Sequence, residues 1–337
     1  MLVPHPRGPL TEGVVRALRG DGDLPQAAAA STERPGVLED EDLQLALWML
    51  FELHYRGFDD VPAESEWDVA LLGFRAALED RLEAELRALT KSTVAKALRA
   101  VESTEDFAEQ LFVLIEGADG PSVAGYLQRE ATKEQVVEFL RQRSIYHLKE
   151  ADPYSLVFAR LDGAPKTALA ELQYDEYGAG RPERLHQTMF GDALEGCGLD
   201  RRYGAYVDEA SAVTLATSNV ASLFSLQRRL RGAAMGHLAA FEATSSAPCR
   251  KIARAIERVG LPEVVRTYFD EHVEADAVHE QVAVRHICGA LVAQDPALAE
   301  DVLFGAAACL AVDALAGQRL LDSWGADPGP TLTAEAS

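Results

Sequence analysis

The chain has 337 residues, with 32 Lys and Arg against 54 Asp and Glu, which gives a formal net charge of −22. Nucleic acids and anionic membranes are bound by basic surfaces, so this charge argues against both as partners. A chain of this length can bury a core large enough to fold without disulfides or a structural metal.

Residues 1–36 are rich in Pro, Gly, Ala and Ser, and we interpret them as a flexible leader. They lack the apolar centre of a secretory signal. The longest uncharged run, residues 210–227, contains many Ser and Thr, which favours a buried helix over a membrane span. No cysteine pair has C-x-x-C spacing, which indicates free thiols in a reducing compartment. We therefore expect a cytoplasmic protein.

A helical period follows the leader. In residues 37–103, apolar side chains recur at steps of three and four, around 43–54 and 71–89, and predict an N-terminal helical subdomain. Residues 104–325 continue the period as a second unit, followed by a tail at 326–337. In this unit, Thr132 and Gln135 form a capping box that predicts a helix start, and Pro153 must stop or kink that helix. Later helices are predicted at residues 164–177, 182–195, 205–242, 262–293 and 297–322. Strand-like alternation is nearly absent, so the predicted fold class is all-α.

Three polar residues lie on the apolar face of the predicted helix 262–293. His272, Asp276 and His279 are spaced by four and seven residues, which turn a helix by about 400° and 700°, so they form one narrow stripe. Buried imidazole and carboxylate groups are costly unless they are paired or bind a metal. This combination suits Fe, Mn or Zn. A structural hydrogen-bonded network is the other interpretation.

A second segment offers Glu176 and His186 on either side of a break formed by glycines and Pro182, which allows the two side chains to converge. Glu183 and His186 form an E-x-x-H pair, the i, i+3 arrangement of di-iron bundles. Glu183 also fits as an acid that complements a helix dipole.

A third segment contains Glu150 near a helix C-terminus, where a carboxylate is disfavoured and needs another partner. His147, three residues earlier, is either a surface histidine or a group that supports Glu150.

The order Glu150, Glu176, His186, His272-x-x-x-Asp276-x-x-His279 resembles the haem-oxygenase-like di-iron oxidases and oxygenases, or iron-containing redox enzymes. Four fragments resemble the actinobacterial branch of that family: LWMLFELHYRGF (47–58), LKEADP (148–153), YDEYGAG (174–180) and FDEHVEAD (269–276). The resemblance extends over about residues 40–325.

This resemblance implies a haem-oxygenase-like helical bundle that binds no haem and holds two Fe(II) ions, with Mn as a substitute and O2 as co-substrate. Carried over residue by residue, the implied ligands are Glu150, Glu176, His186, His272, Asp276 and His279. Groups that would support them are Glu183, His147, Tyr146, Tyr177 and His286, with ordinary packing as the other interpretation of the tyrosines.

Family members N-oxygenate amines, cleave C–C bonds of amino or fatty acids, or desaturate them. The resemblance therefore implies an iron-dependent oxidoreductase that acts on a small molecule in specialised metabolism. An external electron donor and a homodimer are compatible with this activity.

The alternative function is a non-catalytic helical protein that binds metal or a protein partner. A haem oxygenase would need an early axial histidine, for which His54 is the only helical candidate, and haem would clash with six inward ligands. Phosphate, dinucleotide and zincin chemistry are disfavoured, because the G-x-x-x-x-G-K-[ST], G-x-G-x-x-G and H-E-x-x-H motifs are absent.

Overall fold

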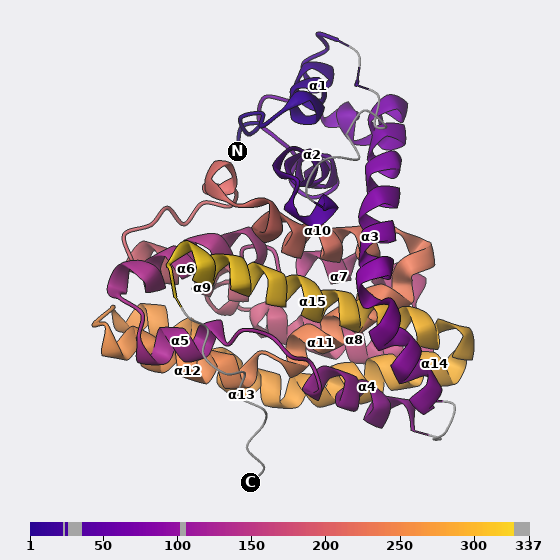
Figure 1. The fold of residues 1–337 in the computed structure, drawn as a ribbon, viewed down its shortest axis with the longest axis vertical. Coiled ribbons are helices and arrows are strands. Elements are labelled where there is room, and N and C mark those ends of the chain that lie inside the picture. Colours follow the sequence, from indigo (N-terminus) through magenta and orange to yellow (C-terminus); the bar gives the residue numbers. More distant parts are fainter. Residues whose placement is uncertain (23, 26–35, 102–105, 327–337) are drawn as a thin grey trace.

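The computed structural model describes residues 1–22, 24–25, 36–101 and 106–326, except for the side chains of 274, 276 and 277. Within these residues the regular secondary structure is entirely helical and no strand occurs, which confirms the all-α prediction (Figure 1). None of the described helices has the length and apolarity that crossing a bilayer requires.

The N-terminal helices are α1 (Pro9–Leu18), α2 (Glu41–Glu52) and the long α3 (Val69–Val101), which leads from these helices to the rest of the molecule (Figure 1). α1 packs on α2, and the buried carboxylate of Asp42 accepts hydrogen bonds from the backbone N–H groups of Leu10 and Thr11 at 2.8 and 2.9 Å. These N–H groups have no partner within the helix, so the contact fixes its start. The predicted flexible leader is therefore wrong for residues 9–18, whereas residues 26–35 lie outside the described residues.

The remaining helices form the bundle that carries the candidate site. In chain order they are α4 (Phe107–Glu116), α5 (Val123–Arg129), α6 (Lys133–His147), α7 (Asp152–Ser155), α8 (Gly163–Glu176), α9 (His186–Gly196), α10 (Ala212–Leu226), α11 (Arg231–Ala243), α12 (Ser246–Arg258), α13 (Glu263–Gln281), α14 (Ala290–Gln294) and α15 (Ala299–Ser323). The capping box at the start of α6 is confirmed, with reciprocal hydrogen bonds between Thr132 and Gln135. The predicted tail beyond residue 326 lies outside the described residues.

The prediction of one helix over residues 205–242 is wrong. The chain leaves the helical conformation at Gln227 (φ −93°, ψ 109°), between α10 and α11. The side-chain amide of Gln227 donates to Glu79 at 2.6 Å, and Arg229 donates to Glu83 at 3.0 Å, both on α3. These contacts provide hydrogen-bond donors for two largely buried carboxylates. The break at Gln227 is therefore stabilised by contacts with α3, which is distant in sequence, and these tertiary contacts outweigh the local helix propensity.

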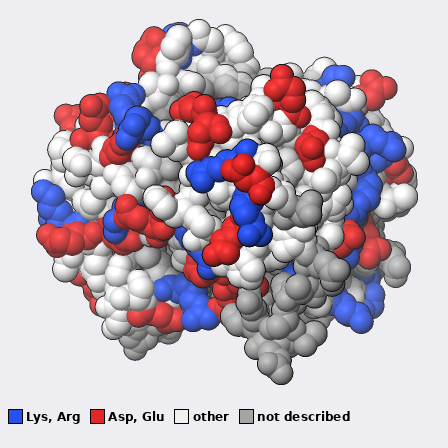
Figure 2. Space-filling view, turned by 90° about the horizontal axis from the view of Figure 1, so that it is seen from above, with Lys and Arg blue, Asp and Glu red and all other residues white. Residues whose placement is uncertain are grey.

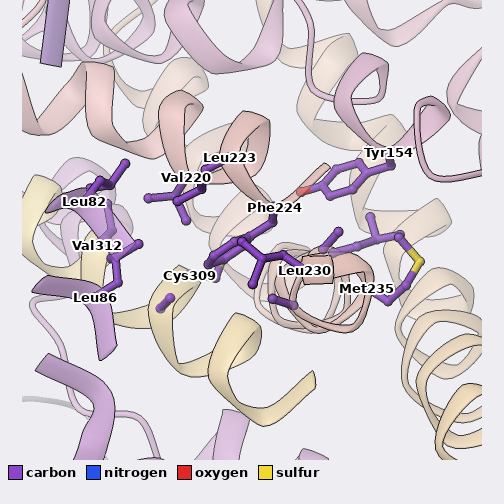
Figure 3. Packing of buried hydrophobic residues seen from close by; sticks show 14 of the residues in the cluster. Leu82, Leu86, Tyr154, Val220, Leu223, Phe224, Leu230, Met235, Cys309 and Val312 are labelled. Atoms are coloured by element: carbon purple, nitrogen blue, oxygen red, sulfur yellow. The ribbon is translucent and has the colours of Figure 1, made fainter. Parts of the chain in front are cut away.

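The core depends on close approach of α11 and α15. A Cβ at Gly236 would lie 1.9 Å from the carbonyl oxygen of Val302, and one at Gly305 would lie 1.9 Å from that of Ala233. Only glycine fits at such a distance. Around this contact, side chains of α3, α10, α11 and α15 form one apolar cluster, part of which Figure 3 shows.

The surface mixes charges of both signs. On the face shown in Figure 2, Lys and Arg side chains lie interspersed with Asp and Glu. On this face, acidic side chains are thus scattered among basic ones rather than gathered in one patch.

Candidate metal centre

Two groups of buried side chains among the described residues have the spacing of metal ligands. The first triad is Glu150, His186 and His272, and the second triad is Glu176, Glu242 and His279. Within each triad, one potential ligand atom per residue lies within 4.8 Å of the others. All six side chains are buried. Five of them, all except Glu242, are among the six predicted ligands, so the structure brings five predicted ligands together. The side chain of the sixth, Asp276, lies outside the described part of α13, and its role stays a prediction.

The break after α8 brings Glu176 close to His186. Glu176 is the last residue of α8 and His186 is the first of α9. Between them, Gly178 has φ +69°, and a Cβ there would lie 2.6 Å from the backbone of Arg184. Glycine therefore allows the chain to fold back tightly. As a result, Glu176 Oε2 lies 3.0 Å from His186 Nδ1, although not in hydrogen-bonding geometry.

In the first triad, the orientation of His272 identifies the atom that faces the site. Its Nδ1–H donates to the carbonyl oxygen of Tyr268 at 2.8 Å. A carbonyl oxygen can only accept, so Nδ1 carries the proton and Nε2 of the neutral ring presents a lone pair. That lone pair faces Glu150 Oε1 at 3.3 Å. Two acceptors at this distance repel each other unless a proton or a metal ion lies between them.

The second triad has a matching arrangement around His279. Its Nδ1 lies 3.4 Å from Glu242 Oε2 and 3.6 Å from Glu176 Oε1. Its Nε2 lies 3.4 Å from Asp175 Oδ2, a half-exposed carboxylate at the end of α8. A carboxylate that holds one ring nitrogen of a histidine while the other nitrogen faces a site is the usual support of a metal ligand.

The electrostatics of the two triads indicate a place for positive charge. Burial opposes a charge on His186, but Glu176 and Glu150 outweigh burial and raise the pKa of its imidazole to about 11. Burial raises the pKa of Glu242, and the neighbouring charge of Glu176 adds to that increase although His279 opposes it. Without a cation, a proton on His186 therefore partly compensates the carboxylates, and a metal ion would replace that proton.

Two predicted supporting groups, and one that was not predicted, contact or adjoin the first triad. His147 hydrogen-bonds Glu150 through Nδ1, and burial lowers the pKa of this imidazole although Glu150 opposes that effect. Tyr268, which sequence reasoning missed, donates its hydroxyl to Glu150 Oε2 at 3.1 Å. Tyr146 lines a small cavity with Glu150 and bonds the hydroxyl of Tyr154 at 3.0 Å.

Three other predicted supporting groups lie elsewhere. Glu183 and His286 are exposed, and Tyr177 bonds Ser155 and Asp152 instead of a triad residue. His286 lies seven residues after His279, but the chain between them enters a π-helical segment, Val282–Gly289. Hydrogen bonds in a π-helix span five residues, so seven residues no longer return to the same face. The predictions for Glu183, Tyr177 and His286 are therefore corrected.

Sequence patterns do not single out Glu242, because residues 205–242 have the period of one continuous helix whose first half is rich in Ser and Thr. A signal was nevertheless present, since Glu242 stands in the last turn of an otherwise largely apolar helix, where a carboxylate is disfavoured. The same signal pointed to Glu150. Asp175 and Tyr268 gave no comparable signal, because their roles depend on distances between helices.

The donor set fits two divalent ions. Three carboxylates and three neutral imidazoles have a charge of −3 against +4, and mixed oxygen and nitrogen donors suit iron or manganese. His186 faces Glu176 without an aligned hydrogen bond, and a cation between them would bind both groups. A cation would likewise remove the repulsion between His272 and Glu150. These residues could therefore hold two metal ions.

Two cavities border the triads, and the smaller is lined by residues of both. One of about 10 Å³, lined by Glu150, Glu176, Glu242 and His272, has room for about one water-sized molecule. A larger cavity of about 330 Å³ borders His147, Tyr268 and His272 and extends to Arg143, which pairs with Asp313 at 2.9 Å. The surroundings therefore offer space for a small organic molecule.

The chain is similar to known proteins in sequence and in fold. Among solved structures, the chain is similar to the 2.00 Å crystal structure of a CADD-like protein of unknown function from Nostoc punctiforme. The two share 19% sequence identity with a TM-score of 0.48, over 71% of this chain and 98% of that chain. No curated protein matches the sequence. The family model of the iron-containing redox enzymes matches residues 137–314, which include both triads. Since this match covers more than half of the sequence, the chain belongs to the family of iron-containing redox enzymes.

Proposed function

We propose that the protein is an O2-activating non-haem di-iron oxidase or oxygenase that acts on a small organic molecule. The first triad would hold one iron ion and the second triad the other. The observation that carries this proposal is that Nε2 of buried His272 faces the Glu150 carboxylate at 3.3 Å while its Nδ1 is held by a carbonyl oxygen, an arrangement that a proton or a metal ion between the two groups stabilises. When bound, two ferrous ions would supply electrons for the reduction of O2.

The protein's own groups would hold the ligands in position. Tyr268 restrains His272 through its carbonyl oxygen and Glu150 through its hydroxyl, so one residue orients two ligands. Asp175 restrains His279 from the opposite side. Such contacts typically change metal affinity by about 10–100-fold.

The cavity of about 330 Å³ is the proposed substrate site. Phe139, Phe241 and Phe269 contribute apolar walls that exclude water, and Arg143 with Asp313 provides polar contacts. This lining suits a substrate with an apolar body and a polar end. An N-oxygenation, a C–C cleavage and a desaturation all remain compatible with it.

An anaerobic Fe(II) titration followed by exposure to O2 tests the proposal. We expect two bound equivalents per chain, measured as iron content, and O2 consumption with a change in the optical and Mössbauer spectra. His279→Ala should abolish the iron-dependent reaction, whereas exposed His286→Ala should leave it unchanged. His147→Ala should be milder than His279→Ala, because His147 acts through Glu150.

Binding of fewer than two equivalents, or two equivalents without O2 consumption, would contradict the proposed activity. The second result would favour a non-catalytic metal-binding protein instead. Screening small amines, amino acids and fatty acids for accelerated O2 consumption then addresses the substrate.

A further inference from the structure

Lys149, the neighbour of Glu150, is a buried cation that the proposed reaction does not use. Its side chain is 2% exposed. The ammonium nitrogen lies 3.5 Å from Glu52 Oε2 on α2, without an aligned hydrogen bond, and 4.3 Å from the centre of the Tyr55 ring. Trp48, also on α2, offers a second ring at 5.5 Å. A buried charge is costly unless it is paired, and the Glu52 carboxylate lies within ion-pair distance of this ammonium group.

Glu52 is itself held from several directions. It is fully buried, it accepts the hydroxyl hydrogen of Tyr203, and it accepts the backbone N–H of Arg56 at 3.3 Å. The Lys149–Glu52 pair therefore joins the turn after α6 to a rigid point on the N-terminal helices.

The turn that contains Lys149 also carries Glu150, between α6 and α7. Leu148 packs into the apolar cluster around Phe190, and the carbonyl oxygen of Ala151 accepts the side-chain amide of Gln173 at 3.0 Å. Lys149 thus contacts α2 while Glu150 contacts the first triad. Lys149 and Glu150 are consecutive residues of one short turn, so both side chains depend on the same stretch of backbone.

We propose that the Lys149–Glu52 pair is a positioning device that sets the Glu150 carboxylate in the first triad. The N-terminal helix α2, which precedes the region matched by the family model, then takes part in forming the metal centre. This inference rests on the proposed role of Glu150 as a ligand.

The test compares Lys149→Met, Lys149→Arg and the double variant Lys149→Met/Glu52→Gln with a matched control. The double variant removes the buried carboxylate that Lys149→Met leaves unpaired, so it separates loss of positioning from loss of folding. The control is Asn219→Ala, which removes the 2.8 Å hydrogen bond from Asn219 to Gln44 and so weakens the same contact between α2 and the bundle. Each protein is examined by anaerobic Co(II) titration, thermal unfolding and a crystal structure of the metal-free form.

In both variants that carry Lys149→Met, we expect the Glu150 carboxylate to move away from His272 and one Co(II) equivalent to bind about 10–100-fold more weakly. The other equivalent should be unchanged, because the second triad lies on α8, α11 and α13. Lys149→Arg should restore part of the affinity, and Asn219→Ala should lose stability without losing affinity.

Unchanged Co(II) binding with Glu150 still 3.3 Å from His272 in the double variant would overturn the inference. If wild-type protein bound no metal, the proposed function would fail, and the Glu150 position in the crystal structures would still decide the role of Lys149.

Discussion

Replacement of Glu242 by glutamine should change the stability of the metal-free and metal-bound protein in opposite directions. Glu242 is buried beside Glu176, and burial together with that neighbour raises the pKa of its carboxyl group. An acid whose pKa is raised by folding stabilises the protein below its unfolded pKa of about 4.3, and this contribution is lost as the pH rises through the folded value. At pH 7.5, well above the unfolded pKa, burying this acid therefore costs stability, and Glu242→Gln removes that cost with little change in side-chain volume.

We estimate a gain of about 1–4 kcal/mol for metal-free Glu242→Gln, the range by which proteins are stabilised when buried ionic groups are replaced by neutral groups of similar volume. For a chain of this length, each kcal/mol corresponds to roughly 1–2 °C in Tm. Metal reverses the order when it is present at about 1,000 times its Kd, because each bound ion then stabilises the native state by about 4.1 kcal/mol. The variant lacks one charged ligand of the second triad and should gain less from metal than the wild type.

Thermal unfolding with and without Mn(II), at pH 5 and 7.5, measures whether metal reverses the order of stability of the variant and the wild type. Exposed Glu257→Gln on α12 is the matched control, and its Tm should follow that of the wild type under all conditions. A metal-free Glu242→Gln protein less stable than the wild type at pH 7.5 would refute the reasoning. The carboxylate of Glu242 would then be a structural hydrogen-bonding group.

Three further predictions concern the ligands, the charge of the site and the packing. His279→Ala should remove one of two bound Mn(II) ions by elemental analysis, whereas exposed Glu183→Gln should retain both; equal metal content would contradict the second triad. Metal binding at pH 8 should release a proton from His186, because the pKa of its imidazole is raised to about 11. Calorimetry in buffers of different ionisation enthalpy counts the released protons, and zero release would show that this imidazole is neutral. Gly236→Ala should lower the free energy of unfolding by about 1–3 kcal/mol because its Cβ would meet a carbonyl oxygen, whereas exposed Gly73→Ala in α3 should raise it by about 0.5–1 kcal/mol. Chemical denaturation measures both glycine variants, and equal stabilities would rule out the close contact of α11 and α15.

Local patterns were sufficient for several features of the fold. The helical period predicted the all-α class, and the Thr132–Gln135 pair predicted the start of α6. His272 and His279 were placed on one buried face because both lie on the regular part of α13. Each of these features depends on residues within a few turns of one another, where helix geometry alone relates their positions.

Features that depend on contacts between distant segments were not predicted. Glu242 faces the second triad only because α10 and α11 are separated by the break at Gln227, which Glu79 of α3 helps to satisfy. The exposure of His286 depends on the π-helical segment. The helix that α1 forms in the presumed leader is capped by Asp42, which lies 32 residues beyond Leu10.

The amino-acid sequence by itself determined the helical class and the kinds of side chain that can bind a metal, because both follow from local periodicity and chemistry. Only the tertiary structure decided which carboxylate faces which imidazole. Glu150, His186 and His272 come from three separate segments of the chain. Glu242 comes from a fourth segment, α11, which none of the sequence patterns connected with a metal site. These distances depend on how closely helices pack, as where two glycines bring α11 against α15, and such packing is not encoded in any one segment.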